Sequence, residues 1–513
     1  MTRNPAEILI IGAGPTGLTL ALWLARLGVP SRIVEKNSGP GLQSRAMVVQ
    51  ARTLEFYRQL GFAEETIERG FKLDSVHLRR GGAEVTHFRI GEIGVGLSPF
   101  PFVLSFPQDD HERLLIEQLS DAGVEVEWGT ELTRFREEDG RVRAILRHEG
   151  CEEVVETSYL CGCDGAKSTV RQGLDLDFPG GTYAQTFFVA DTVATCPSGE
   201  RDVTLFLGDR DFFVIFPIRS SGMRRAIGIF PPEVEGREEP SFEDVRPRLE
   251  AVAELRVSKV NWFSTYRVHH RVTDRFRIGR VFIAGDAGHV HSPAGGQGMN
   301  TGIGDAVNLA WKLAAVLQNR ASPALLETYE AERLPFARLL VSTTDTAFRF
   351  LVGKGVLGKA FRTLVMPRLV PSLLRIEFVR TLAFKVVSQT RIHYRKSPLS
   401  SGHVGKVRAG DRLPWLAEDD NFAPLESLDW QVHIYGDVAP HVRRHILATG
   451  LPLHIFSYTE KTRATGLARD ALYLVRPDGH IALADTGQDP SRLDTYLSRF
   501  AIRPANRSIL PTA

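Results

Sequence analysis

The sequence predicts an α/β protein built from three regions: a βαβ region, an antiparallel sheet and a separate C-terminal region. Strand and helix signals alternate over residues 7–35. Short runs rich in Phe, Ile and Val, separated by Gly, Pro and charged turns, fill residues 203–266 and favour an antiparallel sheet. A stretch rich in Pro, Gly and Asp begins after Ser397, and 513 residues are too many for one compact core.

The composition is that of an ordinary globular protein. The 63 basic and 61 acidic residues leave a net charge of +2, which gives no reason to expect a nucleic-acid partner. The four cysteines contain no CxxC pair, so we expect no metal site, no disulfide framework and a reducing, cytoplasmic location. The N-terminal apolar run is short and ends in glycines, and no later uncharged run reaches the roughly 18 residues of a membrane span. We therefore expect a chain that is neither secreted nor inserted in a membrane.

The first βαβ unit carries a dinucleotide-binding turn. A strand at 7–11 is followed by Gly12-Ala13-Gly14-Pro15-Thr16-Gly17, a helix at 18–27 and a second strand at 31–35. The first glycine allows a tight turn, the second lets a pyrophosphate approach the backbone, and the third lets helix and strand pack closely. Glu35 ends the second strand, where a carboxylate accepts hydrogen bonds from ribose hydroxyls and repels a 2′-phosphate.

A second GxGxxG pattern, at residues 353–358, lacks this context. The segment before it reads as a helix end as much as a strand, and prolines at 367 and 371 interrupt the helix that should follow. We therefore predict a single dinucleotide site.

After the antiparallel region, the pattern again alternates between strand and helix, and the C-terminal region follows. A strand is expected at 280–284 and a long helix at 305–317. Residues 471–481 predict a β-hairpin that turns at Pro477-Asp478-Gly479.

Residues 348–396 are rich in both basic and apolar residues. They indicate either attachment to an anionic membrane or carrier protein, or helices that pack an apolar face on the body while Lys and Arg point outward.

Two further segments join the glycine turn to form a set of three motifs. Residues 163–171 read CDGAKSTVR, with an Asp-Gly pair, and residues 280–289 read RVFIAGDAGH, with a Gly-Asp pair that runs on into SPAGGQGMNT at 292–301. With these motifs, residues 7–345 resemble the class A FAD-dependent aromatic hydroxylases, the family of para-hydroxybenzoate hydroxylase, phenol hydroxylase and the aromatic polyketide hydroxylases.

The resemblance implies a domain organisation. A Rossmann-like FAD-binding domain would comprise residues 1–75, 103–185 and 270–395, and a substrate-binding sheet domain would comprise residues 76–102 and 186–269. Residues 400–513 resemble the thioredoxin-like domain of phenol and polyketide hydroxylases, through AGDRLP at 409–414 and VRPDG at 475–479. This region lacks CxxC, which excludes a dithiol redox role.

The resemblance also implies non-covalent FAD, with NADPH or NADH as co-substrate. Asp286 would bind the ribityl chain, and the N–H groups of residues 298–300 would face the O2/N1 edge of the isoalloxazine. Asp164, oriented by Arg171, would bridge the FAD ribose and the passing NAD(P)H. The implied cofactor-binding residues are Gly12, Gly14, Pro15, Thr16, Gly17, Glu35, Lys36, Arg45, Gln108, Asp164, Asp286, Gly298, Met299 and Asn300.

The catalytic residues follow less directly from the resemblance. Met47 stands where phenol hydroxylases place an acid over the flavin. A proton acceptor could instead be the carbonyl of Pro293, His291 or Tyr266, or one of His269 and His270, and Arg45 would reach the pyrophosphate or the nicotinamide. No dedicated base is required, because in the family a C4a-hydroperoxyflavin carries the chemistry. We expect a flat apolar substrate in a cavity lined by Phe100, Phe102, Phe206, Phe213, Phe216, Trp262 and Phe263.

The predicted function is that of an FAD-dependent monooxygenase. It would use NAD(P)H and O2 to hydroxylate a phenolic or polyketide-type aromatic small molecule, and the chain is compatible with a homodimer. Baeyer–Villiger or epoxidising variants of the same scaffold remain alternatives. A non-catalytic flavin-binding partner protein is an alternative from another class, and it is distinguished by whether NADPH is oxidised and whether aromatics accelerate that oxidation.

Overall fold

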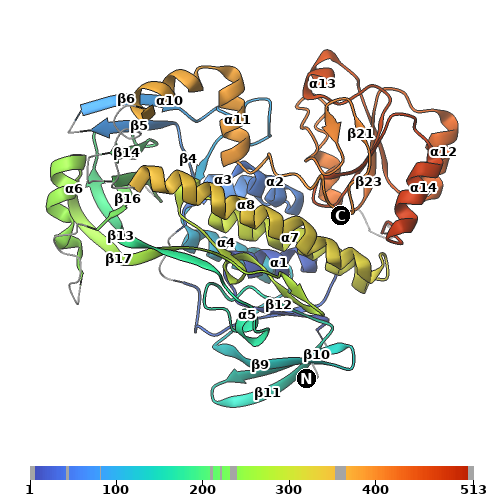
Figure 1. The fold of residues 1–513 in the computed structure, drawn as a ribbon, viewed down its shortest axis with the longest axis horizontal. Helices are drawn as coiled ribbons and strands as arrows, with labels where there is room; N and C mark the ends of the chain where they lie inside the picture. Colours follow the sequence, from blue (N-terminus) through green and yellow to red (C-terminus); the bar gives the residue numbers. More distant parts are fainter. Residues whose placement is uncertain are drawn as a thin grey trace.

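The computed structural model describes residues 6–41, 46–80, 83–207, 212–219, 222–230, 240–352 and 365–505. Figure 1 shows a sheet and its helices at the centre, an extended antiparallel sheet on one side, and the C-terminal strands and helices on the other. The predicted α/β fold class is confirmed.

A six-stranded sheet forms the centre, in the order β18-β19-β12-β1-β2-β8. All neighbouring pairs are parallel except β18 with β19. The strands are β1 (Ile8–Ile11), β2 (Ser31–Glu35), β8 (Val126–Trp128), β12 (Tyr159–Gly162), β18 (Arg277–Ile278) and β19 (Val281–Ile283). All four residues of β1 are buried, as expected of a parallel strand covered on both faces.

Helices cover one face of this sheet and a small sheet covers the other. Helix α1 (Pro15–Arg26) packs between α4 (Gln108–Asp121) and α7 (Gly298–Leu317). The opposite face packs against an antiparallel sheet of β9 (Thr130–Glu138), β10 (Arg141–His148) and β11 (Cys151–Thr157). The shorter or more peripheral elements of this region are α2 (Ala51–Leu60), α3 (Ala63–Arg69), β3 (Val48–Val49), β4 (Phe71–Lys72), β7 (Leu104–Ser105) and α5 (Thr169–Gly173).

An eight-stranded sheet lies beside this centre, in the order β20-β17-β13-β16-β15-β14-β5-β6. Its neighbours are antiparallel except β14 with β5. The strands are β5 (Ser75–Arg80), β6 (Ala83–Arg89), β13 (Gly180–Thr195), β14 (Val203–Leu207), β15 (Phe212–Pro217), β16 (Met223–Ile229), β17 (Arg256–Val272) and β20 (His289–Val290).

The two faces of the large sheet have different neighbours. One face packs against α6 (Arg246–Ala253), and its buried side chains include Phe206, Phe213 and, partly buried, Phe263. The other face carries Phe216, which packs against Met47. We call this second face the inner face, because Met47 belongs to the central region, where its carbonyl accepts the Phe106 N–H next to β7.

This arrangement corrects the predicted cavity lining. Phe206, Phe213 and Phe263 face α6 and cannot line an inner-face cavity, and Phe100 lies in the core around α1 and α4 together with Phe102. Aromatic residue type alone does not tell the two faces apart, because successive side chains of a strand point to opposite faces. Phe216 and Trp262 are the members of the set on the inner face.

The C-terminal region forms a four-stranded sheet in the order β24-β23-β25-β26, parallel between β23 and β24 and antiparallel elsewhere. Strands β25 (Leu472–Val475) and β26 (Ile481–Asp485) form the predicted hairpin. The other elements are β21 (His403–Val404), β22 (Val407–Arg408), β23 (Gln431–Tyr435), α12 (Pro440–Ala448), β24 (Leu453–Phe456), α13 (Glu460–Thr465) and α14 (Pro490–Arg499).

A buried ionic cluster fastens this region to the centre. Glu332, on α8 (Glu327–Val352), accepts hydrogen bonds from Lys312 Nζ at 2.8 Å and from Arg476 Nη1 at 2.7 Å. Arg476 also donates to Asp478 at 2.6 Å, and all four side chains are buried. The cluster joins α7 and α8 to the β25–β26 hairpin.

Part of the basic, apolar stretch forms α10 (Met366–Leu374) and α11 (Glu377–Val387), while residues 353–358, the second GxGxxG pattern, lie outside the described residues. Phe384 is buried against the centre, but Leu369 and Phe378 are exposed. In the ranges that the structure describes, no helix combines the length and the apolarity needed to cross a membrane.

Candidate functional site

The glycine turn between β1 and α1 has the geometry that each glycine was predicted to supply. Gly12 has φ +101°, and a Cβ there would lie 2.5 Å from the Cys163 carbonyl oxygen. A Cβ on Gly17 would lie 2.0 Å from the Gly12 oxygen, so strand and helix touch at this point. A Cβ on Gly14, in contrast, would meet no atom within 4 Å. The backbone therefore faces open space at the one position where a pyrophosphate must approach.

The N-terminus of α1 and Glu35 surround this space. Gly14 is the N-cap residue of α1 and has no side chain to accept the first N–H groups, and Pro15 occupies the first turn. Such an N-terminus favours an anionic ligand. Glu35 accepts hydrogen bonds from the Ala13 N–H at 3.0 Å and from the Asn37 side chain at 2.6 Å, and the neighbouring Lys36 is exposed.

Asp164 lies at the carboxyl end of β12, next to the glycine turn. Its Oδ2 accepts the Val170 N–H at 3.1 Å, whereas its Oδ1 is buried with no hydrogen-bond partner among the described residues. Burial raises the pKa of this carboxyl. A buried acceptor without a donor is costly unless a ligand supplies one. Arg171 donates to the carbonyls of Ala287 and Ala166, so it fixes the loop around Asp164.

The Gly285-Asp286 pair begins a one-turn helix after β19. Gly285 has φ +62°, and Cβ atoms on Gly285 and Gly302 would lie 2.5 and 2.3 Å from Thr16 Oγ1. Thr16, in the first turn of α1, therefore packs between the Gly-Asp turn and α7. Asp286 is exposed at the same edge of the sheet as the glycine turn and Asp164. The three motifs, far apart in sequence, thus meet at the carboxyl ends of β1, β12 and β19.

The N-terminus of α7 forms the far end of the site. Gln297 caps the helix without a side-chain hydrogen bond, so the N–H groups of Gly298 and Met299 begin the helix uncapped. Asn300 is buried and braces this end: its Nδ2 donates to the Val48 carbonyl at 2.8 Å, and its Oδ1 accepts the Gln50 N–H at 2.9 Å. Its side chain is therefore structural.

A buried carboxylate that no sequence motif marks, Asp305, lies behind this sheet edge. Asp305, on α7, accepts hydrogen bonds from the Gly285 N–H at 3.0 Å, from His289 Nε2 at 2.7 Å and from Arg333 Nε at 2.6 Å. Arg333 also donates to the Thr301 carbonyl at 3.0 Å. These contacts hold the Gly-Asp turn against α7 and α8. No local pattern marks them, because the partners come from three separate elements.

Gln108 begins α4, and its Nε2 donates to Glu112 Oε1 at 2.8 Å. Burial is the main cause that raises the pKa of Glu112 to about 7. The Gln108 N–H donates to the carbonyl of Ala46, which directly follows Arg45. Arg45 itself lies outside the described residues.

His291 and Pro293 lie beside the α7 N-terminus. The His291 Nδ1–H donates to the Ser292 carbonyl at 2.8 Å, whereas Nε2 is buried with no partner among the described residues. That Nε2 lies 3.6 Å from the position that a Cβ on Gly298 would take. Burial lowers the pKa of His291 to about 4, so the ring is neutral at pH 7. The Pro293 carbonyl accepts the Gly296 N–H at 3.1 Å, within the turn before α7.

The other predicted proton acceptors lie along the large sheet. The Tyr266 ring is 6.0 Å from the Phe187 ring, near the C-terminal end of α8. His269 is exposed and bonds the Thr182 hydroxyl at 2.8 Å, and His270 lies 3.8 Å from Asp345. Arg271 on β17 pairs with Val290, the residue before His291. Tyr266 precedes Arg271 by five residues, so it lies roughly 17 Å along the strand from His291.

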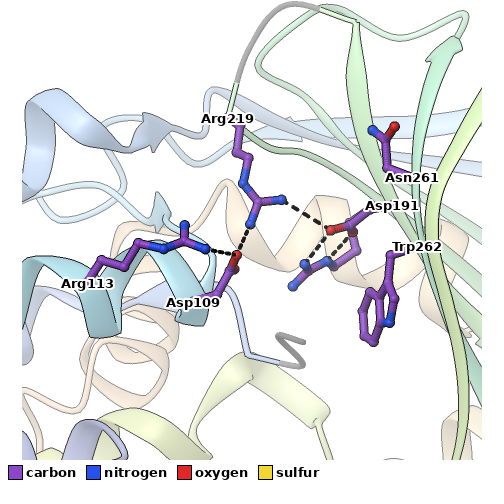
Figure 2. A pocket seen from close by; sticks show the side chains of 7 residues that line it. Asp109, Arg113, Asp191, Arg219, Asn261 and Trp262 are labelled. Carbon is purple, nitrogen blue, oxygen red and sulfur yellow. Dashed lines mark hydrogen bonds and ion pairs between the residues drawn. The ribbon is translucent and has the colours of Figure 1, made fainter. Parts of the chain in front are cut away.

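A charged pocket of about 260 Å³ lies between α4 and the inner face of the large sheet (Figure 2). Arg225 makes a bidentate pair with Asp191, at 2.6 and 2.8 Å, and Arg219 bridges Asp191 and Asp109. Trp262 lines the pocket with a buried Nε1 that has no partner among the described residues. These pairs hold the sheet against α4, and Arg225 Nη1 donates to the Ala46 carbonyl at 3.5 Å.

The residues that meet at the sheet edge fit FAD. Gly14 leaves room for a pyrophosphate, the N-termini of α1 and α7 have no side-chain cap, and Asp164 has a buried oxygen without a partner among the described residues. Glu35 stands where an adenosine ribose would lie. Each of these features suits one part of an adenine dinucleotide with a ribityl extension.

The comparisons with known proteins agree with this geometry. The family model "FAD binding domain" matches residues 5–344. The chain is 38% identical over 423 residues to 6-methylpretetramide 4-monooxygenase of Streptomyces rimosus, covering 79% of this chain and 72% of the relative. It is 33% identical over 519 residues to 12-dehydrotetracycline 5-monooxygenase/anhydrotetracycline 6-monooxygenase of the same species, covering 94% and 96%.

The likeness extends to solved structures. An anhydrotetracycline hydroxylase from Streptomyces rimosus superimposes with a TM-score of 0.78 at 28% identity, over 98% of this chain and all of the other. Because the family model covers well over half of the chain and the second relative is matched almost end to end, the predicted resemblance is confirmed. The chain belongs to the FAD-binding-domain family of flavin-dependent monooxygenases.

Proposed function

We propose that this protein uses NAD(P)H and O2 to hydroxylate a flat phenolic or polyketide-type aromatic. The proposal rests on the meeting of the three motifs at one sheet edge, where Gly302 near the uncapped start of α7 lies against Thr16 and Gly285. Relatives named for tetracycline-type substrates support the aromatic polyketide class. The cytoplasmic location, the homodimer and the absence of a nucleic-acid partner stay predictions.

Bound FAD would supply the redox chemistry that takes electrons from NAD(P)H and activates O2. The α1 N-terminus and Gly14 would hold the pyrophosphate, Glu35 and Asp164 the ribose hydroxyls, and Asp286 the ribityl chain. The N–H groups at the start of α7 would stabilise negative charge at the pyrimidine edge of the ring, by about 1 kcal/mol for each favourable interaction. The inner-face residues Phe216 and Ile227, packed around Met47, offer an apolar surface to an aromatic substrate.

His291 is our proposed proton acceptor for the substrate hydroxyl. Since the Ser292 carbonyl can only accept, the Nδ1 of His291 carries the proton and the Nε2 lone pair is available. That lone pair is buried and directed at the N-terminus of α7. The Pro293 carbonyl, two residues on, could orient the same hydroxyl through its second lone pair. Arg45 and Tyr266 remain further proposed site residues.

We expect His291→Ala to lower kcat for hydroxylation about 100-fold, since a placed general base contributes about that much. FAD content and the rate of anaerobic reduction by NAD(P)H should stay at wild-type values, because His291 acts after reduction. The pKa of about 4 also predicts that wild-type kcat shows no inflection near pH 6.5 from this residue. His148→Ala, at a histidine on β10 bonded to Thr130, is the matched control. Equal turnover in both variants would exclude the proposed role.

The donor and the substrate class can be tested together. FAD-loaded protein is mixed with NADH or NADPH in stopped flow, alone and with a panel of phenols and linear polycyclic aromatics. We expect one donor to reduce the protein faster, and polycyclic phenols to accelerate reduction. Reduction that is equally slow with every aromatic would argue for the non-catalytic flavin-binding alternative.

A further inference from the structure

A cluster of two histidines and a glutamate lies on the outermost hairpin of the large sheet, on the face opposite to the inner face. His77 on β5 and His87 on β6 are directly opposite each other in the strand register, and their rings stack with centroids 5.3 Å apart. The strand neighbour Leu78 points the other way, into the inner-face core, while Arg79 reaches Glu254 beside α6. The cluster is therefore remote from the flavin site.

A β-bulge brings Glu84 to the same face. Glu84 and His87 are three residues apart, so a regular strand would place them on opposite faces. Leu78 pairs with Thr86, but the next residue, Arg79, pairs with Glu84 and not with Val85. The strand register therefore shifts by one residue at this point. A bulge of this kind re-aims a side chain, and here it turns the carboxylate toward both imidazoles.

The two imidazoles converge on this one carboxylate through the same ring atom. His77 Nδ1 lies 2.9 Å from Glu84 Oε2, and His87 Nδ1 lies 2.9 Å from Glu84 Oε1. One ligand atom from each of the three residues lies within 4.8 Å of the others. A tetrahedral zinc ion with bonds of about 2.1 Å separates its ligands by roughly 3.4 Å, so only small side-chain shifts are needed.

An outer carboxylate orients one of the histidines. His77 Nε2 lies 3.1 Å from Asp202 Oδ2, and the same oxygen accepts the Gly199 N–H at 3.0 Å. With a metal at Nδ1, the Nε2–H of His77 would donate to Asp202, which is the carboxylate–histidine–metal arrangement of bound zinc ions. Asp202 lies just before β14, so the arrangement also ties that segment to the hairpin.

We propose that His77, Glu84 and His87 bind a first-row divalent metal ion, Zn²⁺ in the first instance, with water completing the coordination and Asp202 orienting His77. Two imidazoles and one carboxylate are a ligand set that suits Zn²⁺. The sparse cysteines predict no metal site, but two histidines paired across strands can bind an ion without any cysteine. Because β6 is the edge strand and packs against α10, the ion would fasten the outer hairpin of the sheet.

The test is calorimetric titration of tag-free, FAD-loaded protein with Zn²⁺ in a Cys151→Ser background, which removes an exposed thiol. We expect binding that His87→Ala and Glu84→Gln each weaken by at least about 100-fold. Asp202→Asn should weaken it by about 10- to 100-fold, as for other outer-shell partners. His445→Ala, at a half-exposed histidine with a single carboxylate partner, should leave it unchanged.

Two further readouts separate a built site from loose surface binding. Zn²⁺ should raise the unfolding temperature of the protein but not of His87→Ala, since an ion that binds only the folded state stabilises it. Co²⁺ in the same site should give the intense visible absorption of a tetrahedral complex. The proposal would be overturned if the wild-type protein bound no Zn²⁺. It would also be overturned if His87→Ala kept the wild-type affinity, or if His445→Ala lowered the affinity as much as His87→Ala does.

Discussion

Replacing Gly14 by valine is expected to abolish FAD binding while leaving the protein folded. The backbone of Gly14 has φ −76° and ψ 178°, which any residue can adopt, and a Cβ there meets no protein atom within 4 Å. The valine side chain would instead occupy the space needed by the pyrophosphate. An overlap of this kind costs roughly 3 kcal/mol or more, which weakens binding at least about 100-fold.

The experiment compares flavin content and folding in three glycine variants. FAD is released by heat and identified in the supernatant, which also tests that it is non-covalent, and folding is followed by circular dichroism. Gly487→Val is the matched control, because Gly487 has room for a side chain in the C-terminal region. Gly17→Val should lose both flavin and fold, since its Cβ would lie 2.0 Å from the Gly12 oxygen. A Gly14→Val protein that purifies with one FAD per chain would refute the assignment of the turn.

Glu332→Gln is expected to destabilise the protein by about 3–5 kcal/mol, because it leaves Arg476 and Lys312 buried without their counter-charge. The two cations hold the pKa of Glu332 at about 2 although burial opposes this. In the unfolded chain a glutamate has a pKa of about 4.3. The stabilisation is therefore complete above about pH 4.5 and is lost as the pH falls toward 2.

Unfolding in urea, followed by tryptophan fluorescence, measures this effect. Trp311 reports directly on the cluster, because its ring lies 5.2 Å from the Arg476 guanidinium and packs edge-on against Trp430. Glu418→Gln breaks the exposed pair with Lys461 and serves as the control, with an expected change below about 1 kcal/mol. If Glu332→Gln and Glu418→Gln unfold at the same urea concentration, the cluster does not fasten the C-terminal region.

The parts of the site that the sequence predicted are those encoded by short segments. The glycine turn, Asp164 and Asp286 each stand within a motif whose backbone geometry follows from a few neighbouring residues, such as the positive φ of Gly12 and Gly285. The order of motif, strand and helix then fixes which sheet edge they share. For this reason the fold class and the cofactor class could be predicted before any coordinates.

The parts that escaped prediction depend on contacts between distant segments. Glu332 and Arg476 are separated by 144 positions, and neither residue stands in a pattern that marks it. The predicted cavity lining was wrong for Phe206, Phe213 and Phe263, because strand parity puts them on the α6 face. The proposed metal ligands carry no sequence signal, because a bulge changes that parity at Glu84. The side-chain geometry around His291 likewise required the position of α7.

Turnover under ¹⁸O₂ measures whether the protein transfers one oxygen atom from O2 to an aromatic substrate at the expense of NAD(P)H. An accepted polycyclic phenol is the substrate, and NAD(P)H, peroxide and product are all quantified. We expect each product molecule to gain one ¹⁸O atom, and product plus peroxide to equal the NAD(P)H consumed. A product without ¹⁸O, or NAD(P)H consumption recovered entirely as peroxide for every aromatic tested, would contradict this expectation.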